Sequence, residues 1–286
     1  SRLAGDGGLA RNMSYRLSSD REFLDFLERI RLFELDQSID IIQIEKPVPA
    51  KMLEIGAGSG WQAKELAKIG YDVSAIDLEN SLYVEQRVWD VIDYDGQNIP
   101  FPDAHFDVVF SSNVLEHIPH VVEFQNEIRR VLKPDGVAVH LLPSGSWRIW
   151  TTLTHYPFCL KFAAKILLSK MRRSGSHEHS GLESPSKEYG RPEGKMILRA
   201  MWPHRHGEFG NTLTEIFYFS KFRWMRLFEK SGWQVKKYLT NDLFYTGHLL
   251  FSDKMSVHLR RKLSSIAGSA CHVFVLKTAT PSDQQG

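Results

Sequence analysis

Short apolar runs alternate with helix-like stretches along residues 51–142, and this alternation restricts the fold more than any other feature of the sequence. The run "FDVVFS" at 106–111, for example, is apolar enough to be buried on both faces, as in a parallel sheet. Strands that alternate with helices form parallel sheets joined by crossover helices. We therefore expect a doubly wound α/β domain. The expected strands of this segment are 51–55, 72–77, 87–92, 106–111 and 137–143.

Composition changes divide the chain into four segments. Residues 1–46 are expected to form an N-terminal helical lid, because apolar residues recur there at helical spacing until "KPVP" ends the element. Residues 47–142 form the α/β core. Residues 143–220 interrupt the alternation with Pro, Gly, Ser and His clusters, which indicates an inserted substrate cap. Residues 221–286 return to a helix and two strands and complete an expected sheet of seven strands.

Bulk composition is that of an ordinary soluble protein. Of 286 residues, 42% are hydrophobic and 24% are charged. No apolar run approaches the roughly 20 residues that a spanning helix needs, and Cys159 and Cys271 indicate neither a disulfide framework nor a metal site. These features predict a cytoplasmic protein. The net charge of +2 and the lack of a recognisable binding module speak against a nucleic-acid partner.

The first expected strand ends in a glycine-rich turn, "LEIGAGSGWQ", with the spacing G-x-G-x-G. A dinucleotide-binding turn has the spacing G-x-G-x-x-G, and Trp61 stands where its third glycine would fall. A bulky indole argues against tight packing around a pyrophosphate. No Gly-Lys-Ser/Thr follows, so the turn is not a nucleotide-phosphate loop either. Backbone amides at the start of the following helix can still receive a carboxylate.

An acid at the end of the second expected strand suggests what the turn serves. Asp77 stands 21 residues after Gly56, where a carboxylate can accept hydrogen bonds from both hydroxyls of a ribose. A ribose without a pyrophosphate, together with a carboxylate near the turn, fits S-adenosylmethionine better than a nicotinamide dinucleotide.

Several motifs in order resemble those of the class I S-adenosylmethionine-dependent methyltransferases, in particular the type 11-like group. "LEIGAGSG" resembles their glycine-rich first motif and "AIDLE" their second-strand acid. "DGQNIPFPDAHFDVVFSSNVLEHI" resembles the stretch that runs into their fourth strand, and "RRVLKPDGVAVHLLP" the helix, turn and fifth strand that follow. The resemblance implies a seven-stranded Rossmann-like sheet, with S-adenosyl-L-methionine as cofactor and S-adenosyl-L-homocysteine as product.

The resemblance also implies which residues hold the cofactor. Its methionine end is expected against the glycine turn and the end of the fourth strand, its ribose against the second-strand acid, and its adenine against the next loop. The residues implied for the methionine end and its turn are Glu54, Gly56, Ala57, Gly58, Gly60, Ser112 and Asn113. Those implied for the ribose and the adenine are Asp77, Leu78, Asp95 and Gly96, with Asp93 as an alternative to Asp95.

An oxygen acceptor must lose its proton, and histidine is the commonest base. His206 with Glu208 resembles an "H-G-E" element of relatives with a similar insertion, and we expect it to act as base or substrate contact. His117, in "VLEHIP", is the second candidate. Three further histidines of the insertion are assigned to loops: His177, His179 and His204. We expect no metal, because the two His-x-His pairs lie far apart and no fixed third ligand is evident.

The sequence leaves the acceptor open. Our first hypothesis is O-methylation of a small molecule or a glycan, including a lipid-linked or cell-surface saccharide. Carbon methylation of a quinone or sterol-like ring is the runner-up, and a non-catalytic protein that binds S-adenosylmethionine is the alternative of another class. "SSNV" follows the fourth strand where nucleobase methyltransferases usually carry Asn/Asp-Pro-Pro-aromatic, which argues against a nucleobase acceptor.

The stretch 147–173 predicts a basic amphipathic helix that follows two tryptophans, Trp147 and Trp150. Such a helix can lie at a membrane surface, although it can also be a cap packed over the active site. Contact with the inner face of a membrane is therefore a further expectation. The sequence does not indicate an oligomeric state.

Overall fold

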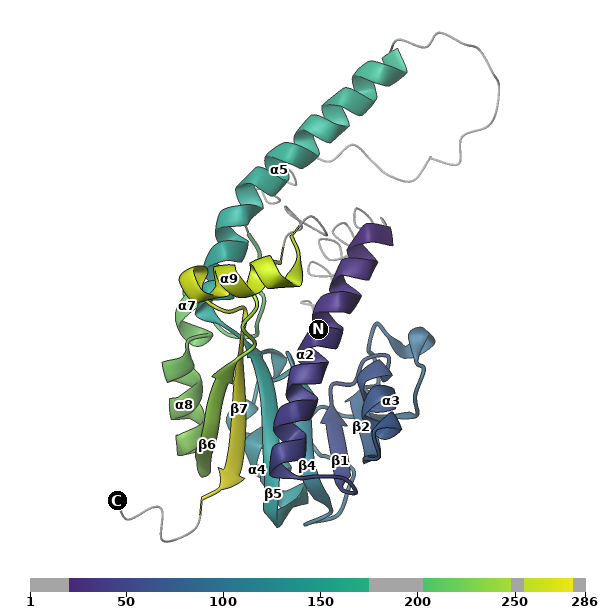
Figure 1. The fold of residues 1–286 in the computed structure, drawn as a ribbon, viewed down its shortest axis with the longest axis vertical. Helices are drawn as coiled ribbons and strands as arrows, with labels where there is room; N and C mark the ends of the chain where they lie inside the picture. The colour runs from purple at the N-terminus through teal and green to yellow at the C-terminus, as the bar shows by residue number, and fades with distance from the viewer. Residues whose placement is uncertain (1–20, 175–202, 248–254, 280–286) are drawn as a thin grey trace.

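The computed structural model describes residues 21–174, 203–247 and 255–279 (Figure 1). In these residues seven strands form one sheet, in the order β3-β2-β1-β4-β5-β7-β6. The strands are β1 (Lys51–Ile55), β2 (Asp72–Leu78), β3 (Val91–Tyr94), β4 (Phe106–Ser112), β5 (Leu132–Pro143), β6 (Trp233–Thr240) and β7 (Cys271–Thr278). β7 runs antiparallel to β5 and β6, and the other pairs are parallel. This arrangement confirms the predicted doubly wound α/β sheet.

Two strands differ from their predicted limits. The third was expected at 87–92 and instead spans Val91–Tyr94, where it pairs with the last four residues of β2. Arg87 lies outside the strand because the chain folds back there, and its guanidinium donates to the carbonyl of Val91 at 3.1 Å. β5 begins earlier than expected, because Leu132 already pairs with β4 before a shift in register.

Helices cover both faces of the sheet. In the described residues they are α2 (Arg21–Glu45), α3 (Trp61–Lys68), α4 (Val121–Val131), α5 (Gly145–Ser174), α7 (Glu215–Tyr218), α8 (Lys221–Lys230) and α9 (Val257–Ala267), with the short 3-10 helices η1 (Val84–Gln86) and η2 (Leu115–His117). α2 and α3 pack on one face through Leu35, Ile42 and Leu66. α4 and α8 pack on the other through Phe124 and Phe228. The two apolar layers fix the positions of the loops at the carboxyl ends of the parallel strands.

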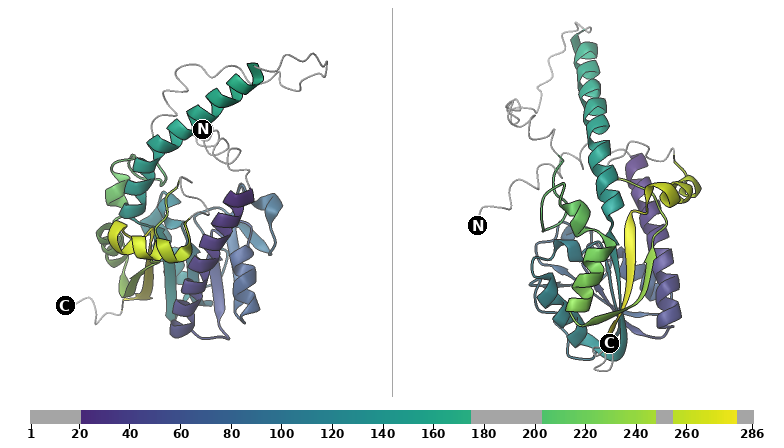
Figure 2. Two further views of the ribbon diagram at one scale, coloured as in Figure 1. Left: turned by 45° about the horizontal axis from the view of Figure 1, so that its top comes forward. Right: turned by 90° about the vertical axis from the view of Figure 1, so that its left-hand side faces the viewer.

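The predicted N-terminal helix is present from Arg21, and residues 14–20 lie outside the described residues. The region after β5 opens with one 30-residue helix, α5, which runs away from the sheet (Figure 2). His177 and His179 fall between α5 and the next described residues, so the structure does not describe them.

The two tryptophans at the start of α5 contribute to the fold. Trp147 is buried against Phe219 and Cys271, and the indole N–H of Trp150 donates to the carbonyl of Ala267 at 2.9 Å. Within the described segments no helix is both long and apolar enough to cross a membrane.

Candidate functional site

The turn between β1 and α3 has a backbone shape that glycine adopts readily and other residues do not. Gly56, Gly58 and Gly60 have φ of 70°, 58° and 76°, all in the left-handed region. The amides of Gly56 and Ala57 donate to the carbonyl of Ile76 at 2.9 and 3.1 Å. These two amides, which were expected to face the cofactor, are thus engaged in tying the turn to β2.

Glu54 lies at the end of β1, directly below the turn, and only 2% of it is exposed. Burial raises the pKa of this carboxyl to about 8, and the nearby charge of Asp77 adds to the shift, although an amide hydrogen bond from Ala63 opposes it. Among the described residues its Oε2 has no hydrogen-bond partner. A buried, unpartnered carboxylate oxygen is costly unless a donor or cation meets it. The ammonium group at the methionine end of S-adenosylmethionine is such a cation, so Glu54 fits this cofactor.

Asp77 stands at the end of β2 and is half-buried beside the turn. Its Oδ2 accepts hydrogen bonds from the amide of Gly58 at 3.0 Å and from the hydroxyl of Ser81 at 2.8 Å, and its Oδ1 accepts from the amide of Leu78 at 2.8 Å. These bonds fix the carboxylate next to the glycine turn, as the ribose role requires. The structure therefore brings Asp77 and Gly58 together, and the ribose role of Asp77 stays a prediction.

The loop after β3 contains the residues predicted for the adenine. Gly96 and Leu78 are close neighbours, since a Cβ added at Gly96 would lie 2.8 Å from Cδ2 of Leu78. Asp95 is exposed and accepts the amides of Gln97 and Asn98 at 2.8 and 2.7 Å, which together with the Asn98 side chain lower its pKa. Its carboxylate therefore caps the loop through these hydrogen bonds. It is also the acceptor predicted for the amino group of adenine.

β4 ends at Ser112, and Asn113 turns the chain away from the sheet with φ of 55°. The amide of Asn113 donates to the carbonyl of Leu141 at 2.9 Å, and its side-chain amide donates to the hydroxyl of Ser112 at 3.3 Å. Ser112 and Asn113 are therefore held at the carboxyl end of the sheet, beside the end of β1, where ligands bind in open α/β folds. This is the position predicted for the methionine end.

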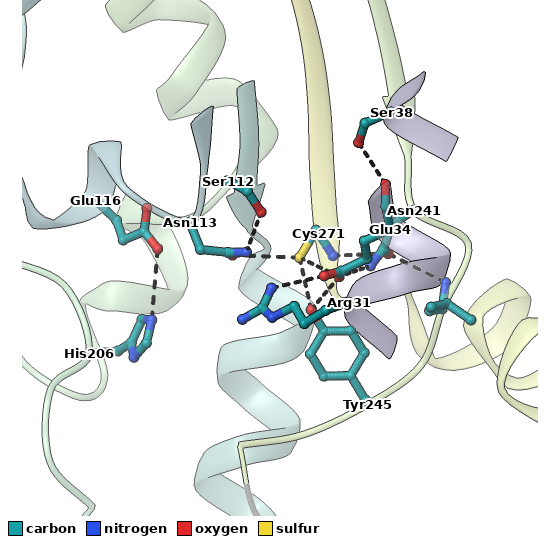
Figure 3. A network of polar contacts seen from close by, with 11 residues as sticks. Arg31, Glu34, Ser38, Ser112, Asn113, Glu116, His206, Asn241, Tyr245 and Cys271 are labelled. Carbon is teal, nitrogen blue, oxygen red and sulfur yellow. Dashed lines mark hydrogen bonds and ion pairs between the residues drawn. The ribbon is translucent and has the colours of Figure 1, made fainter. Parts of the chain in front are cut away.

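Three residues after Asn113, two imidazoles approach a buried carboxylate. Glu116 is 3% exposed, and its Oε1 lies 3.6 Å from Nε2 of His117 and 3.8 Å from Nε2 of His206. The two imidazole rings are 4.9 Å apart between centroids. Burial raises the pKa of Glu116, and the charge of a protonated His117 opposes that rise. Figure 3 shows Glu116 and His206 facing each other next to Asn113.

A buried ion pair holds the loop that carries His206. Oε1 of Glu215 accepts the amides of His206 and Gly207 at 2.6 and 2.7 Å, and its Oε2 pairs with Nε of Arg148 at 2.8 Å. Gly207 brings this loop against η2, because a Cβ there would lie 2.9 Å from the carbonyl oxygen of Glu116. The position of His206 is therefore set by the fold.

Glu208, which was named with His206 as part of the "H-G-E" element, has its own contacts in the structure. Glu208 is half-buried, with its carboxylate 3.8 Å from Arg205, and its amide donates to the carbonyl of Glu116 at 2.8 Å. The carboxylate beside His206 is that of Glu116, which the sequence interpretation did not single out although it precedes His117. His204 is exposed, as expected of a loop residue.

A second polar cluster, also missed from the sequence, lies on the other side of Asn113 in Figure 3. Glu34 of α2 is 1% exposed and accepts hydrogen bonds from Arg31 at 2.8 Å, from the side chain of Asn241 at 2.9 Å and from the hydroxyl of Tyr245 at 2.6 Å. The thiol of Cys271 is 3.1 Å from that hydroxyl, and burial raises the pKa of both groups. The i, i+3 pair of Arg31 and Glu34 within an apolar helix is the one local signal of this cluster. The cluster ties α2 to β7 and to the loop after β6.

Comparison with known proteins assigns the central segment. Residues 53–140 match the family model described as a methyltransferase domain. This match includes the glycine turn, Asp77, Asn113 and the Glu116–His117 pair.

Curated relatives are similar over the same part of the chain. A bifunctional biotin-biosynthesis protein from Cellvibrio japonicus is 28% identical over 150 residues, which are 49% of this chain and 30% of the relative. A ubiquinone-biosynthesis O-methyltransferase from Actinobacillus pleuropneumoniae is 27% identical over 48% of this chain and 61% of its own length. A sterol 24-C-methyltransferase from Gibberella zeae is 33% identical over 30% of this chain and 26% of its own length. The chain thus spans less than two thirds of each of these relatives.

Solved structures include a methyltransferase from Aquifex aeolicus dependent on S-adenosylmethionine. It is 13% identical, with a TM-score of 0.45 over 87% of this chain and 97% of that one. A complex of a Haloferax volcanii methyltransferase activator with a methyltransferase has a TM-score of 0.49 at 14% identity, over 91% of this chain and 96% of that one. The family match of residues 53–140 and the observed strand order therefore identify this segment as a methyltransferase domain of the class I S-adenosylmethionine-dependent type.

Proposed function

We propose that the protein transfers a methyl group from S-adenosylmethionine to an oxygen atom of a small-molecule or glycan acceptor. The observation that carries the proposal is the Glu116–His117–His206 cluster, which lies next to the end of β4. An oxygen acceptor releases a proton during transfer, and the cluster offers imidazole nitrogens and a carboxylate to take it.

When bound, the cofactor supplies a methyl group on a sulfonium, which is already activated for displacement. The chain's own residues therefore have to bind the two reactants, align them and exclude water from the site. Asp77 and Gly58 hold the ribose side, and Glu54 faces the methionine end from below the turn. The hydroxyl proton of the acceptor moves to His206 or His117, and Glu116 stabilises the imidazolium that forms. Trp147 packs edge-on against His206, at 4.7 Å between ring centroids, and shields it on that side.

A carbon acceptor, such as a quinone or sterol-like ring, is the second candidate. The rings of Trp147 and Phe219 beside His206 favour a flat apolar acceptor, and the likeness to a sterol 24-C-methyltransferase is consistent with one. The two histidines favour oxygen, because a base-poor pocket would suit carbon methylation better. A lipid-linked saccharide, cytoplasmic location and contact of residues 147–173 with a membrane remain narrower predictions.

Analysis of the methylated product distinguishes transfer to oxygen from transfer to carbon. The purified chain is incubated with methyl-labelled S-adenosylmethionine and, in turn, with phenols, saccharides and quinol or sterol acceptors. We expect label on oxygen, identified by the chemical shift of the methyl carbon in the product. Label on a ring carbon alone would replace the oxygen proposal with the second candidate. Donor binding without transfer to any of these acceptor classes would favour the non-catalytic alternative.

The role of Asp77 is tested by donor affinity. Asp77→Ala is expected to weaken binding of S-adenosylhomocysteine by about tenfold or more, because a hydrogen bond to a charged group contributes roughly 1.5–3 kcal/mol. Calorimetric titration measures the change. Asp72→Ala removes an exposed acid at the opposite end of the same strand and should bind as the unaltered chain does. Equal affinity in Asp77→Ala would remove this residue from the cofactor site.

A further inference from the structure

We propose that Glu116, His117 and His206 form a binding site for one divalent transition-metal ion of the zinc class. The inference deepens the proposed function, because the cluster is the one that would meet the acceptor. It rests on the geometry of the cluster and on the chemistry of its ligand atoms, and it revises the expectation from sequence that the protein holds no metal.

The separations of the three groups suit a shared ion. One ligand atom from each residue lies within 4.8 Å of the other two, and Oε1 of Glu116 is 3.6 and 3.8 Å from the two Nε2 atoms. These two separations are too long for hydrogen bonds. Zinc–nitrogen and zinc–oxygen bonds are about 2.0–2.2 Å, so two ligands of one ion lie up to about 4 Å apart. The two carboxylate–imidazole separations fall within that limit, so Glu116 and each histidine are spaced to share an ion.

The state of Glu116 is a second, independent observation. None of its side chain is exposed, and among the described residues neither carboxylate oxygen has a hydrogen-bond partner. A carboxylate in this condition is unfavourable unless a cation compensates it. A bound metal ion provides that compensation directly, at the oxygen that already faces both histidines.

The scaffold around the cluster is rigid, as a metal site requires. The amide of Glu208 donates to the carbonyl of Glu116 at 2.8 Å, which joins the loop after α5 to η2. The buried Glu215–Arg148 pair holds the backbone at His206, and Trp147 packs on its ring. The side chains of His117 and His206 are 36% and 33% exposed, so an ion can enter from solvent.

The ligand set selects the class of metal. Two imidazoles and one carboxylate favour zinc and its neighbours over magnesium or calcium, which prefer oxygen ligands. Three protein ligands with an open position are typical of catalytic rather than structural zinc sites. The open position would be available to an acceptor oxygen, close to Ser112 and Asn113. The ion would lower the pKa of that hydroxyl, and its proton would pass to solvent, because an imidazole that ligates the metal cannot also accept it.

Retention of zinc tests the site. The full chain is stripped with a chelator, loaded with Zn²⁺, freed of excess ion by gel filtration, and its metal content is measured by mass spectrometry. We expect about one ion per chain. Glu116→Gln and His206→Gln should each weaken Zn²⁺ affinity by on the order of a hundredfold or more, measured by competition with a chelating dye. Circular dichroism establishes that each variant is folded.

Two controls exclude retention by other histidines. His204→Ala removes an exposed imidazole two positions from His206, and a His177→Ala/His179→Ala double variant removes the second His-x-His pair. Both should retain zinc as the unaltered chain does. Retention of no zinc by the unaltered chain, or unchanged affinity in folded Glu116→Gln, would overturn the metal site. Methyl transfer to oxygen by the stripped chain would overturn a metal role in the reaction while leaving the proposed function intact.

Discussion

Replacement of His206 by alanine or glutamine is expected to lower turnover by about 10²- to 10⁴-fold, the usual contribution of a positioned acid–base group. Affinity for S-adenosylhomocysteine should stay the same, because the proposal places the cofactor against the glycine turn and Asp77, whereas His206 faces Glu116. Glutamine keeps most of the volume that packs against Trp147, so a loss in both variants reflects lost chemistry rather than lost packing. A loss of this size is expected whether His206 takes the proton itself or ligates a metal.

The matched control for this prediction is His204→Ala. His204 lies on the same loop, and its backbone carbonyl accepts a hydrogen bond from the guanidinium of Arg148 at 2.7 Å. Its side chain is exposed, so turnover should be within a factor of about two of the unaltered chain, as for surface substitutions generally. Single-turnover kinetics at saturating donor separate the chemical step from binding. Equal turnover in His206→Gln and the unaltered chain would exclude His206 from the reaction.

The second large effect concerns the stability of the chain without cofactor as a function of pH. Burial raises the pKa of Glu54 from 4.5 to about 8. Below pH 4.5 the carboxyl is protonated in both the folded and the unfolded chain, and it contributes no pH dependence. Between about 4.5 and 8 it ionises only when unfolded, so the free energy of unfolding falls as pH rises. The shift corresponds to roughly 4 kcal/mol across that range.

The glutamine of Glu54→Gln cannot ionise. This variant should therefore lack the contribution of Glu54 to the pH dependence of the free energy of unfolding. Denaturant unfolding of both chains at pH 5 and pH 8 measures it, and the difference between the two chains should change by roughly 4 kcal/mol between these pH values. Glu79→Gln, which alters an exposed carboxyl after β2, is the control and should track the unaltered chain. Parallel stability curves for Glu54→Gln and the unaltered chain would contradict a neutral, unpaired Glu54 in the cofactor-free fold.

Local sequence signals predicted the fold, and they singled out residues that the fold brings together at the end of β1. The glycine turn and Asp77 are found from sequence because both follow strands within a repeated strand–helix pattern, and neighbouring parallel strands bring their ends together. Asp77 and Gly58 are 19 positions apart and bonded at 3.0 Å. The third strand was misplaced because the amide of Val88 donates to the carbonyl of Ser59 at 2.8 Å and not to β2, a contact that hydrophobic patterning does not report.

The acceptor side depends on contacts between distant segments, which one sequence does not reveal. His206 was assigned the nearest acid along the chain, Glu208, whereas the fold presents Glu116 to it. That pairing arises because a glycine at 207 lets two loops touch through their backbones. The bond between Glu34 and Tyr245 spans 211 positions and has no local signal beyond an i, i+3 charge pair. Sequence motifs therefore indicated the two histidines but not the carboxylate that they face.

Binding of the donor by the unaltered chain tests the central claim most directly. Calorimetric titration with S-adenosylhomocysteine, in parallel with nicotinamide adenine dinucleotide, compares the two ligands that a glycine turn followed by a second-strand acid can serve. We predict one site per chain for S-adenosylhomocysteine, with affinity weakened about tenfold or more in Asp77→Ala, and no measurable heat from the dinucleotide. Binding of the dinucleotide in its place would contradict the assignment of Glu54, the glycine turn and Asp77 to a sulfonium cofactor.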